Sequence, residues 1–539
     1  MGEGKSLVCI AAAPSKCAAM LRDAWTCALG RTRWPTDSAV GRRLESMALL
    51  PEVKKDYGRI KNYVNGEWVE STSSKDMDIE NPTTGGIIGK VPMSTADETK
   101  AAIDAAQDAW EAWRETPPIT RARIFFKLKE LMEQNYEETA RIMVQEQGKT
   151  IDEARGETRR SIENVEVAAG IPSMMMGYNL EDGAAQGIDE DAITSPLGVF
   201  GCIAPFNFPA MIPYWFWPYA VATGNCYIIK SSSQVPLTQW SLFSMIDKAG
   251  FPPGVINLVN GSREVSDTMM DHPDMKGISF VGSTPVAKYI YKKCGENGKR
   301  VQAQGGAKNS LVVMPDANLP RTISNMLASF YGCAGQRCLA GSNLVAIGDI
   351  ADPLIEKFVE TSKKIKMGYG LDESVNMGPV VSAKAKKKVL DYIDGAEAEG
   401  AKLLIDGRGA KVPGYEKGHF VGPTVVDGVT PDMKIAKEEI FGPVVSYLRM
   451  DTLDDAIEFI HKSPFGNAAS IYTQSGKDAR DFRYKVQCGN IGINIGIVAA
   501  MAYFPFAGYK DSFFGDLHGQ GRDAISFFTD RKVVITRWF

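Results

Sequence analysis

After Leu197 the sequence alternates regularly between apolar, strand-like runs and helical patterns. The strand-like runs occupy residues 199–204, 226–230, 255–259 and 277–281, and each is followed by a turn or a helical pattern. Strands spaced by helices are typical of parallel sheets, because a parallel connection must cross back over the sheet. We therefore predict an α/β fold with a doubly wound sheet. A second α/β unit is expected over about 307–511, with strands at 310–314 and 343–347.

The region upstream is predicted to be mainly helical. Ordered structure is expected from Ile60, with a hairpin turn at Asn65-Gly66. Thr95 and Glu98 have the spacing of a helix capping box, and apolar residues at helical spacing follow them. Amphipathic helix is expected to continue to about residue 176.

Composition excludes several classes of function. A chain of 539 residues is too long for one simple core, so two or three subdomains are expected. The net charge of −4 provides no general attraction to nucleic acid or to an anionic membrane. The apolar stretch 198–229 is long enough to span a bilayer, but it contains Pro205, Pro209, Pro213 and Pro218. We predict a strand, a loop, a short helix and a strand there, and no membrane partner.

Residues 1–57 are expected to form a leader that is either disordered or a targeting segment. Basic residues outnumber acidic ones there, which weakly resembles a transit peptide, but Met47 is an equally good start of the protein. We expect a cytoplasmic protein, or a mitochondrial-matrix protein if the leader is a transit peptide.

Cysteines and histidines show no metal-ligand pattern. The nine cysteines include no CxxC pair, which indicates neither a zinc site nor a disulfide framework, and free thiols favour a reducing compartment. None of the four histidines pairs at metal-ligand spacing, so no metal is expected.

Two segments point to chemistry. Cys338 follows Gly335-Gln336-Arg337, and a thiol beside a fixed cation is expected to have a lowered pKa and to act as a nucleophile. Asn207 lies between two prolines, where its amide can serve as an oxyanion donor. Together they predict covalent catalysis through a thioester. The alternatives are a packed free cysteine and an asparagine that only shapes a turn.

Two familiar phosphate-binding motifs are absent from the sequence. No GxGxxG fingerprint follows a strand, and there is no Walker A loop. Gly148-Lys149-Thr150 lacks the upstream glycine and falls in a helical region, so we interpret it as structural. A dinucleotide would have to bind at a variant Rossmann site.

From about residue 60 onward the chain resembles the aldehyde dehydrogenase family. The matching strings are Ala204-Pro-Phe-Asn-Phe-Pro209, Phe280-Val-Gly-Ser-Thr284, Gly306-Ala-Lys308, Gly335-Gln-Arg-Cys338, Glu438-Glu-Ile-Phe-Gly-Pro443 and Phe504-Pro-Phe-Ala-Gly-Tyr-Lys510. Three further strings are most similar to the CoA-acylating methylmalonate-semialdehyde dehydrogenases of that family: Arg160-Ser-Ile-Glu-Asn-Val-Glu166, Lys299-Arg-Val-Gln302 and Asp511-Ser-Phe-Phe-Gly515.

The resemblance implies a domain organisation. A variant Rossmann NAD domain would cover 58–176 and 197–306, and an α/β catalytic domain would cover 307–511. Oligomerisation elements, a hairpin and a terminal strand, would lie at 177–196 and 522–539, and a homodimer or homotetramer is expected.

The resemblance also implies a mechanism. Cys338 would attack an aldehyde, Asn207 and the backbone N–H of Cys338 would hold the oxyanion, and a thioester would remain after hydride transfer to NAD. Hydrolytic members have a water-activating Glu where this chain has Gln304. Because an amide is no base, the thioester should wait for CoA as co-substrate.

Substrate and product follow from the same resemblance. Methylmalonate or malonate semialdehyde would give propanoyl-CoA or acetyl-CoA with loss of CO2. A hydrolytic enzyme for another aldehyde, or a non-catalytic protein that keeps the fold, is the alternative.

Arg160 and Arg337 resemble the two arginines that hold the substrate carboxylate in those enzymes. A guanidinium group suits a bidentate carboxylate contact. Arg160 lies beside Arg159 on a predicted helix, so a solvated helix face is the alternative for it.

For the cofactor, the resemblance places Ala204 and Phe206 at the nicotinamide, Lys230 at the adenosine ribose, Ser283 at the pyrophosphate and Glu439 at the nicotinamide ribose. Ser233, Gln234, Gly305 and Phe441 complete the expected cofactor-binding set. The family usually has Lys-Pro-Ser-Glu where this chain has Lys230-Ser-Ser-Ser233. Loss of that carboxylate removes repulsion against a 2′-phosphate, so NAD is expected and NADP is the alternative.

Overall fold

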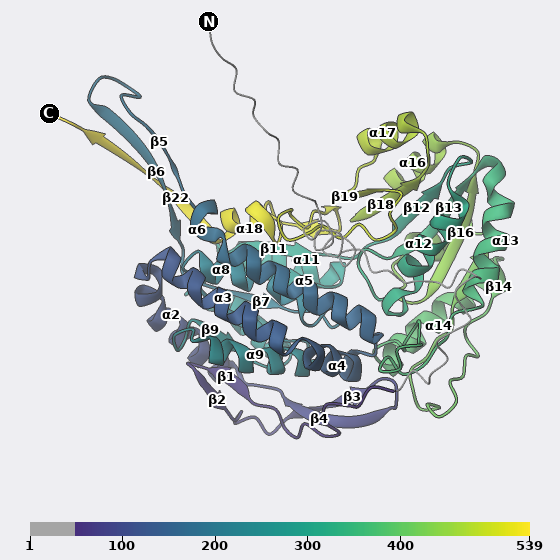
Figure 1. Ribbon diagram of the computed structural model, residues 1–539, viewed down its shortest axis with the longest axis horizontal. Coiled ribbons are helices and arrows are strands. Elements are labelled where there is room, and N and C mark those ends of the chain that lie inside the picture. Colours follow the sequence, from purple (N-terminus) through teal and green to yellow (C-terminus); the bar gives the residue numbers. More distant parts are fainter. Residues whose placement is uncertain (1–48) are drawn as a thin grey trace, which may run out of the picture. The chain divides into compact units, whose positions relative to one another are not determined.

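The computed structural model describes residues 49–539 (Figure 1). Most of the expected leader therefore lies outside the described residues. Its last part is placed, because Leu50 N donates to Leu371 O at 3.0 Å and Tyr57 N donates to Ile88 O at 2.7 Å. The prediction that order begins at Ile60 is wrong, since these backbone hydrogen bonds already fix the chain from Leu50.

An eight-stranded sheet forms the first half of the fold. Its strand order is β2-β1-β9-β8-β7-β10-β11-β21, and the five strands from β9 to β11 run parallel. Their order is the doubly wound one, so the prediction of a doubly wound parallel sheet is confirmed. The strands are β1 (Asn62–Val64), β2 (Glu67–Val69), β7 (Val199–Ile203), β8 (Cys226–Lys230), β9 (Ile256–Leu258), β10 (Met275–Val281), β11 (Arg300–Gln304) and β21 (Phe513–Phe514).

Helices pack on this sheet and on one another (Figure 1). The predicted capping box is present at the start of α2, where Thr95 and Glu98 satisfy each other's backbone groups. The helices are α2 (Ala96–Glu115), α3 (Pro118–Gln134), α4 (Tyr136–Gln147), α5 (Ile151–Ala169), α6 (Ile171–Met174), α7 (Met211–Tyr214), α8 (Trp217–Ala222), α9 (Leu237–Ala249), α10 (Arg263–Asp271) and α11 (Thr284–Glu296). Residues 198–229 form a strand, a loop, two short helices and a strand, so the prediction holds except that two short helices stand where one was expected.

A seven-stranded sheet forms the second half. Its order is β14-β15-β16-β13-β12-β18-β19, and all neighbours except β14 and β15 are parallel. Its strands are β12 (Asn309–Val313), β13 (Gly341–Ile347), β14 (Lys402–Ile405), β15 (Thr424–Asp427), β16 (Val444–Met450), β18 (Ala468–Tyr472) and β19 (Asn490–Ile493). Its helices are α12 (Leu319–Tyr331), α13 (Ala351–Ser362), α14 (Ala383–Ala398), α15 (Lys434–Lys437), α16 (Leu453–Lys462) and α17 (Gly476–Lys485).

Two small two-stranded sheets complete the body. They pair β3 (Asp76–Asn81) with β4 (Gly86–Pro92), and β17 (Phe465–Gly466) with β20 (Tyr509–Lys510). Within residues 49–539, no helix combines the length and apolar character that crossing a membrane requires.

A three-stranded sheet projects from the body as an arm (Figure 1). It consists of β5 (Tyr178–Leu180), β6 (Ile188–Pro196) and β22 (Thr529–Arg537). Residues 522–528, expected as part of the terminal oligomerisation element, instead lie in helix α18 (Gly521–Phe528). The reason is hydrophobic burial, because Phe527 and Phe528 of this helix pack against Phe200 of the central sheet.

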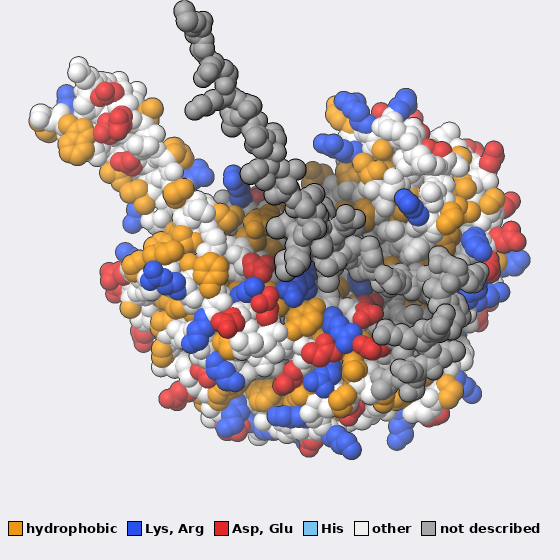
Figure 2. Space-filling view, in the orientation of Figure 1, with side chains coloured by type: hydrophobic (Ala, Val, Ile, Leu, Met, Phe, Trp, Pro, Cys, Tyr) orange, Lys and Arg blue, Asp and Glu red, His pale blue; other side chains and the backbone are white. Residues whose placement is uncertain are grey.

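The arm exposes many apolar side chains, which appear as orange atoms on the projection in Figure 2. They are Tyr178, Leu180, Ile193, Val533, Val534, Ile535, Trp538 and Phe539. Exposed apolar side chains gathered on one element are a candidate surface for association.

Candidate active site

Several predicted site residues meet at one edge of the eight-stranded sheet. Ala204 follows β7, Lys230 ends β8, Ser283 follows β10 and Gln304 ends β11. Neighbouring strand ends are joined by hydrogen bonds, since Ala204 N donates to Lys230 O at 3.0 Å and Gly282 N donates to Gln304 O at 3.1 Å. These are the carboxyl ends of parallel strands where the strand order reverses, which is where doubly wound folds bind ligands.

The backbone at Cys338 is held from the second sheet. The Cys338 carbonyl oxygen accepts hydrogen bonds from the side-chain amides of Asn309 and Asn467, each at 2.7 Å. The preceding 3-10 turn, Gly332–Gly335, contains Cys333 at φ 49° and Ala334 at φ 51°. Two successive non-glycine residues in the left-handed region are strained, and such strain is typical of functional sites.

Cys338 is half-buried, whereas the other cysteines of residues 49–539 are buried. Burial raises the pKa of its thiol to about 12, and the charge of Glu439 raises it further. The backbone N–H groups of Cys338 and Leu339 and the charge of Arg337 oppose this rise but do not outweigh it. The prediction of a lowered pKa is therefore wrong for the protein without ligands.

The contacts of the Arg337 side chain explain why its charge does little to lower the Cys338 pKa. Its Nε donates to Cys333 Sγ at 3.3 Å, and its guanidinium forms a 3.0 Å ion pair with Glu153. The cation next to Cys338 in sequence is thus committed to two other groups, so its effect on the Cys338 thiol is small.

Asn207 is buried and lies against the Cys338 loop. Its Nδ2 donates to Gln336 O at 3.0 Å, and its own backbone oxygen accepts from Lys149 Nζ at 2.8 Å. The structure therefore brings the predicted oxyanion donor to within two residues of the predicted nucleophile.

Gln304 is 2% exposed and lies at the end of β11. Its Nε2 donates to Phe506 O at 3.1 Å. Its Oε1 has no hydrogen-bond partner within the described part of the chain. A buried acceptor without a partner costs free energy unless a ligand or water supplies a donor.

The two predicted carboxylate-binding arginines are each paired with a protein carboxylate. Arg160, on α5, forms a 2.9 Å ion pair with Glu163, and Arg337 pairs with Glu153. Arg160 is 26% exposed at its side chain and its neighbour Arg159 is 41% exposed. Arg160 is therefore more enclosed than a residue on a freely solvated helix face.

Four of the predicted cofactor-binding residues lie along the edge of the first sheet. Burial lowers the pKa of Lys230 to about 8. The hydroxyl of Ser233 donates to Gly261 O at 2.7 Å, whereas Gln234 is exposed. Ser283 is the N-cap of α11, and a helix N-terminus favours a phosphate group.

Two predicted cofactor-binding residues come from the second half of the chain. Glu439 Oε1 accepts from Ala307 N at 3.1 Å, and burial raises the pKa of its carboxyl to about 7. The rings of Phe206 and Phe441 pack edge to face with centroids 5.8 Å apart. Phe441 has φ 62°, a strained conformation for a bulky residue.

Two glycines let the backbone pass close to other protein groups at this edge. A Cβ on Gly305 would lie 2.4 Å from Asp511 O, and one on Gly306 would lie 2.9 Å from Glu439 Oε2. Only glycine lets the backbone pass so close to these groups. The cofactor assignment remains a prediction at the level of single residues.

Sequence reasoning missed three charged residues behind the site: Lys149, Glu153 and Glu157. Lys149 belongs to the turn that was interpreted as structural, and it is buried in an ion pair with Glu157. Glu153 and Glu157 are one helical turn apart on α5 and therefore share a face. That i, i+4 spacing of acids is the signal that could have found them.

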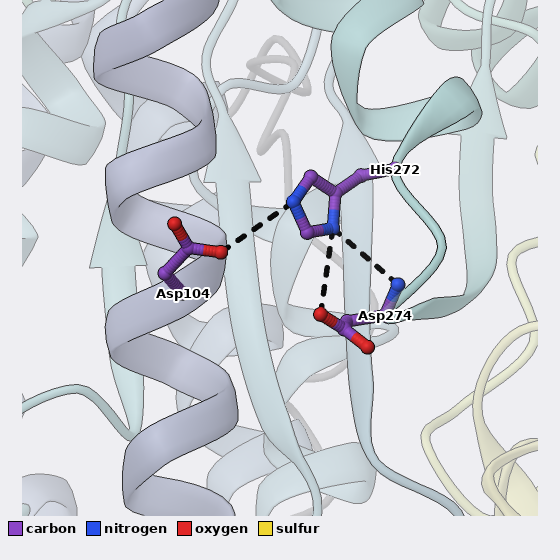
Figure 3. A group of neighbouring side chains, drawn as sticks. All are labelled: Asp104, His272 and Asp274. Atoms are coloured by element: carbon purple, nitrogen blue, oxygen red, sulfur yellow. Dashed lines mark hydrogen bonds and ion pairs between the residues drawn. The ribbon is translucent and has the colours of Figure 1, made fainter.

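A separate group of titratable side chains lies outside the site (Figure 3). Asp104 and Asp274 flank His272, at 3.5 Å from Nε2 and 3.9 Å from Nδ1 respectively. His272 Nδ1 accepts from Asp274 N at 3.3 Å, so the neutral ring carries its proton on Nε2 and directs it at Asp104. Nδ1 is thus hydrogen-bonded within the protein, and Nε2 faces the Asp104 carboxylate.

Comparisons with known proteins identify the family. The sequence pattern of the aldehyde dehydrogenase family matches residues 68–534. The chain is 47% identical to malonate-semialdehyde dehydrogenase 2 of Geobacillus kaustophilus (strain HTA426) over 479 residues, covering 89% of this chain and 99% of that one.

Solved structures give the same result. A Sinorhizobium meliloti 1021 protein assigned as a methylmalonate-semialdehyde dehydrogenase and complexed with NAD superposes with a TM-score of 0.88 at 41% identity, covering 89% and 98% of the two chains. Methylmalonate-semialdehyde dehydrogenase from Oceanimonas doudoroffii has a TM-score of 0.88 at 42% identity, covering 89% and 99%. The fold is thus that of the aldehyde dehydrogenase structures, and the chain belongs to the aldehyde dehydrogenase family.

Proposed function

We propose that this enzyme oxidises malonate or methylmalonate semialdehyde and passes the acyl group from Cys338 to CoA. The observation that carries the proposal is the buried amide of Gln304, at the position where the family resemblance implies a carboxylate in hydrolytic members. An amide cannot take a proton from water, so the acyl group should await a stronger nucleophile. The names of the malonate- and methylmalonate-semialdehyde dehydrogenases that it resembles support the substrate class.

Catalysis begins when the Cys338 thiolate attacks the aldehyde carbon. The carbonyl oxygen becomes an oxyanion, held by Asn207 Nδ2 and the Cys338 backbone N–H. NAD, when bound, would supply the acceptor for the hydride of this carbon. The bond from Sγ to the acyl carbon remains as a thioester.

The thioester is then resolved by a thiol. A CoA thiolate attacks the acyl carbon, the bond to Cys338 Sγ breaks, and the enzyme thiolate is regenerated. A carboxylate β to a thioester carbonyl loses CO2 readily, because the electron pair released can delocalise onto the thioester oxygen. The resulting enolate then takes a proton from solvent at its α-carbon. Asn207 can stabilise that oxygen as it stabilises the first oxyanion. The products are acetyl-CoA from malonate semialdehyde and propanoyl-CoA from methylmalonate semialdehyde.

Arg160 and Arg337 are proposed to hold the carboxylate of the substrate. Each is already paired with a glutamate, so the substrate carboxylate would join or replace that partner. A guanidinium group has five N–H donors and can contact two carboxylates at once.

NAD is the proposed cofactor and NADP is the alternative. Ala204, Phe206, Lys230, Ser283, Gly305, Glu439 and Phe441 would bind it along the sheet edge. Ser233 stands where the family usually has a carboxylate near the adenosine ribose, which removes repulsion against a 2′-phosphate. The arm of β5, β6 and β22 is proposed to join copies of this chain in a homodimer or homotetramer, because its exposed apolar side chains need a partner.

Steady-state turnover tests the proposal. Purified protein would be incubated with each semialdehyde and NAD, with and without CoA, while NADH is followed and the products are identified by mass spectrometry. CoA-dependent turnover that gives acetyl-CoA or propanoyl-CoA supports it. Equal turnover without CoA would indicate the hydrolytic alternative and a water-activating base other than residue 304.

A further inference from the structure

A buried ion pair lies directly behind the loop that presents Asn207. Lys149 Nζ contacts Glu157 Oε2, and both side chains are fully buried. The same Nζ donates to Asn207 O at 2.8 Å and lies 4.2 Å from the centroid of the Phe208 ring. Lysine has three N–H donors, and these contacts occupy the space around its ammonium group.

Glu157 holds the far end of the same loop. Its Oε1 accepts from Ala210 N at 2.8 Å and from Met211 N at 3.1 Å. The ion pair therefore hydrogen-bonds to three backbone groups of the segment 207–211, one carbonyl and two N–H groups. Asn207 lies at one end of this segment, and its side chain reaches across to Gln336 O.

Lys149 is itself fixed by the second half of the chain. A Cβ on Gly370 would lie 2.0 Å from Lys149 O, and one on Gly378 would lie 1.8 Å from Gly148 O. Ile151 N donates to Gly370 O at 2.9 Å. The backbone at residues 148–151 is therefore packed closely against residues 370 and 378, which leaves little room for the turn that carries Lys149 to move.

A fully buried ion pair is a poor way to gain stability, because desolvating two charges offsets most of their attraction. Its position behind a predicted catalytic amide points to a different use. We propose that Lys149 and Glu157 are positioning residues that set the place of the Asn207 amide, and so of the oxyanion site, relative to Cys338. This inference rests on the proposed role of Asn207 as oxyanion donor.

Combining changes at Lys149 and Glu157 with Asn207→Ala tests whether the ion pair acts through Asn207. The variants are Asn207→Ala, Lys149→Met/Glu157→Gln and all three changes together. The paired change leaves no unpaired buried charge, and a glutamine at 157 keeps an oxygen for Ala210 N and Met211 N. The readout is the single-turnover NADH burst without CoA, which reports acylation of Cys338 whether or not CoA is the later acceptor.

We expect Asn207→Ala to slow the burst by about 10²–10³-fold and the paired change to slow it by roughly 10²-fold, since a displaced donor loses most of its effect. Added to Asn207→Ala, the paired change should slow it no further, because the group it positions is already gone. The KM for NAD and the alkylation rate of Cys338 should stay within about twofold, because the paired change touches neither group.

A matched control is Lys129→Met, which removes a lysine from a surface ion pair with Glu133 on α3 and should leave the burst unchanged. Multiplicative loss in the triple variant would overturn the inference, as would a paired variant that acylates at the unaltered rate. Neither result bears on the CoA dependence of the starting enzyme, so the two proposals fail separately.

Discussion

The Cys338 thiol should react faster when the charge of Glu439 is removed. Glu439 is the second cause, after burial, of the raised Cys338 pKa. Its own pKa of about 7 means that it is about 90% ionised at pH 8 and mostly neutral at pH 6. Glu439→Gln should therefore increase the thiolate fraction of Cys338 only above about pH 7.

The size of the effect follows from the two pKa values. With a pKa of about 12, Cys338 is a thiolate in about one molecule in 10⁴ at pH 8. A charge close to a titrating group shifts its pKa by about 1–3 units, and a cause that ranks below burial belongs at the lower end. One unit would make alkylation at pH 8 about tenfold faster, because only the thiolate reacts.

Alkylation by iodoacetamide, followed by peptide mapping from pH 6 to 10 without NAD, measures this rate at Cys338 alone. The matched control is Glu438→Gln. Glu438 is exposed and bonded to the Tyr392 hydroxyl, so its removal should change little. An equal effect at pH 6 and pH 8 would refute the reasoning, as would an unaltered protein whose rate already levels off near pH 8.

Three further predictions concern substrate, acceptor and cofactor. Arg160→Gln should raise KM for malonate semialdehyde by about 10–100-fold, the range of a lost charge-assisted hydrogen bond, and leave KM for uncharged propanal unchanged. Arg159→Gln is the matched control, and an equal rise in KM for both aldehydes would contradict a role of Arg160 in binding the substrate carboxylate. Gln304→Glu should allow NADH production without CoA that increases with pH as the new carboxyl ionises, because a carboxylate can take a proton from water. Steady-state assays without CoA measure this rate, and turnover that still requires CoA at every pH would contradict the prediction. Ser233→Glu should lower the NADP-to-NAD ratio of kcat/KM by about tenfold or more through charge repulsion with the 2′-phosphate; an unchanged ratio would remove Ser233 from the cofactor site.

Much of the fold could be predicted because local signals agree with the tertiary structure. The turn at Asn65-Gly66, the Thr95 capping box and the apolar runs around Val199 and Cys226 appear where the sequence placed them. Each depends on residues close together in the chain, where turn chemistry and side-chain periodicity decide the conformation.

What could not be predicted depends on contacts between distant residues. Leu50 is ordered because its backbone N–H donates a hydrogen bond to Leu371 O. The two residues are far apart in the sequence, so no local pattern predicts this contact. The Arg337 charge was expected to lower the Cys338 pKa, but adjacency in sequence does not say that its guanidinium meets Glu153 and Cys333 instead. Burial then dominates the electrostatics of the site.

The central claim is that an acyl group on Cys338 is released by a thiol and not by water. Rapid mixing of the enzyme with malonate semialdehyde and NAD, without CoA, tests it most directly. We predict a burst of about one NADH for each Cys338, then a stall with the acyl group detectable on that residue by mass spectrometry, and release on adding CoA. Continuous NADH production without CoA, at the rate seen with it, would contradict the account.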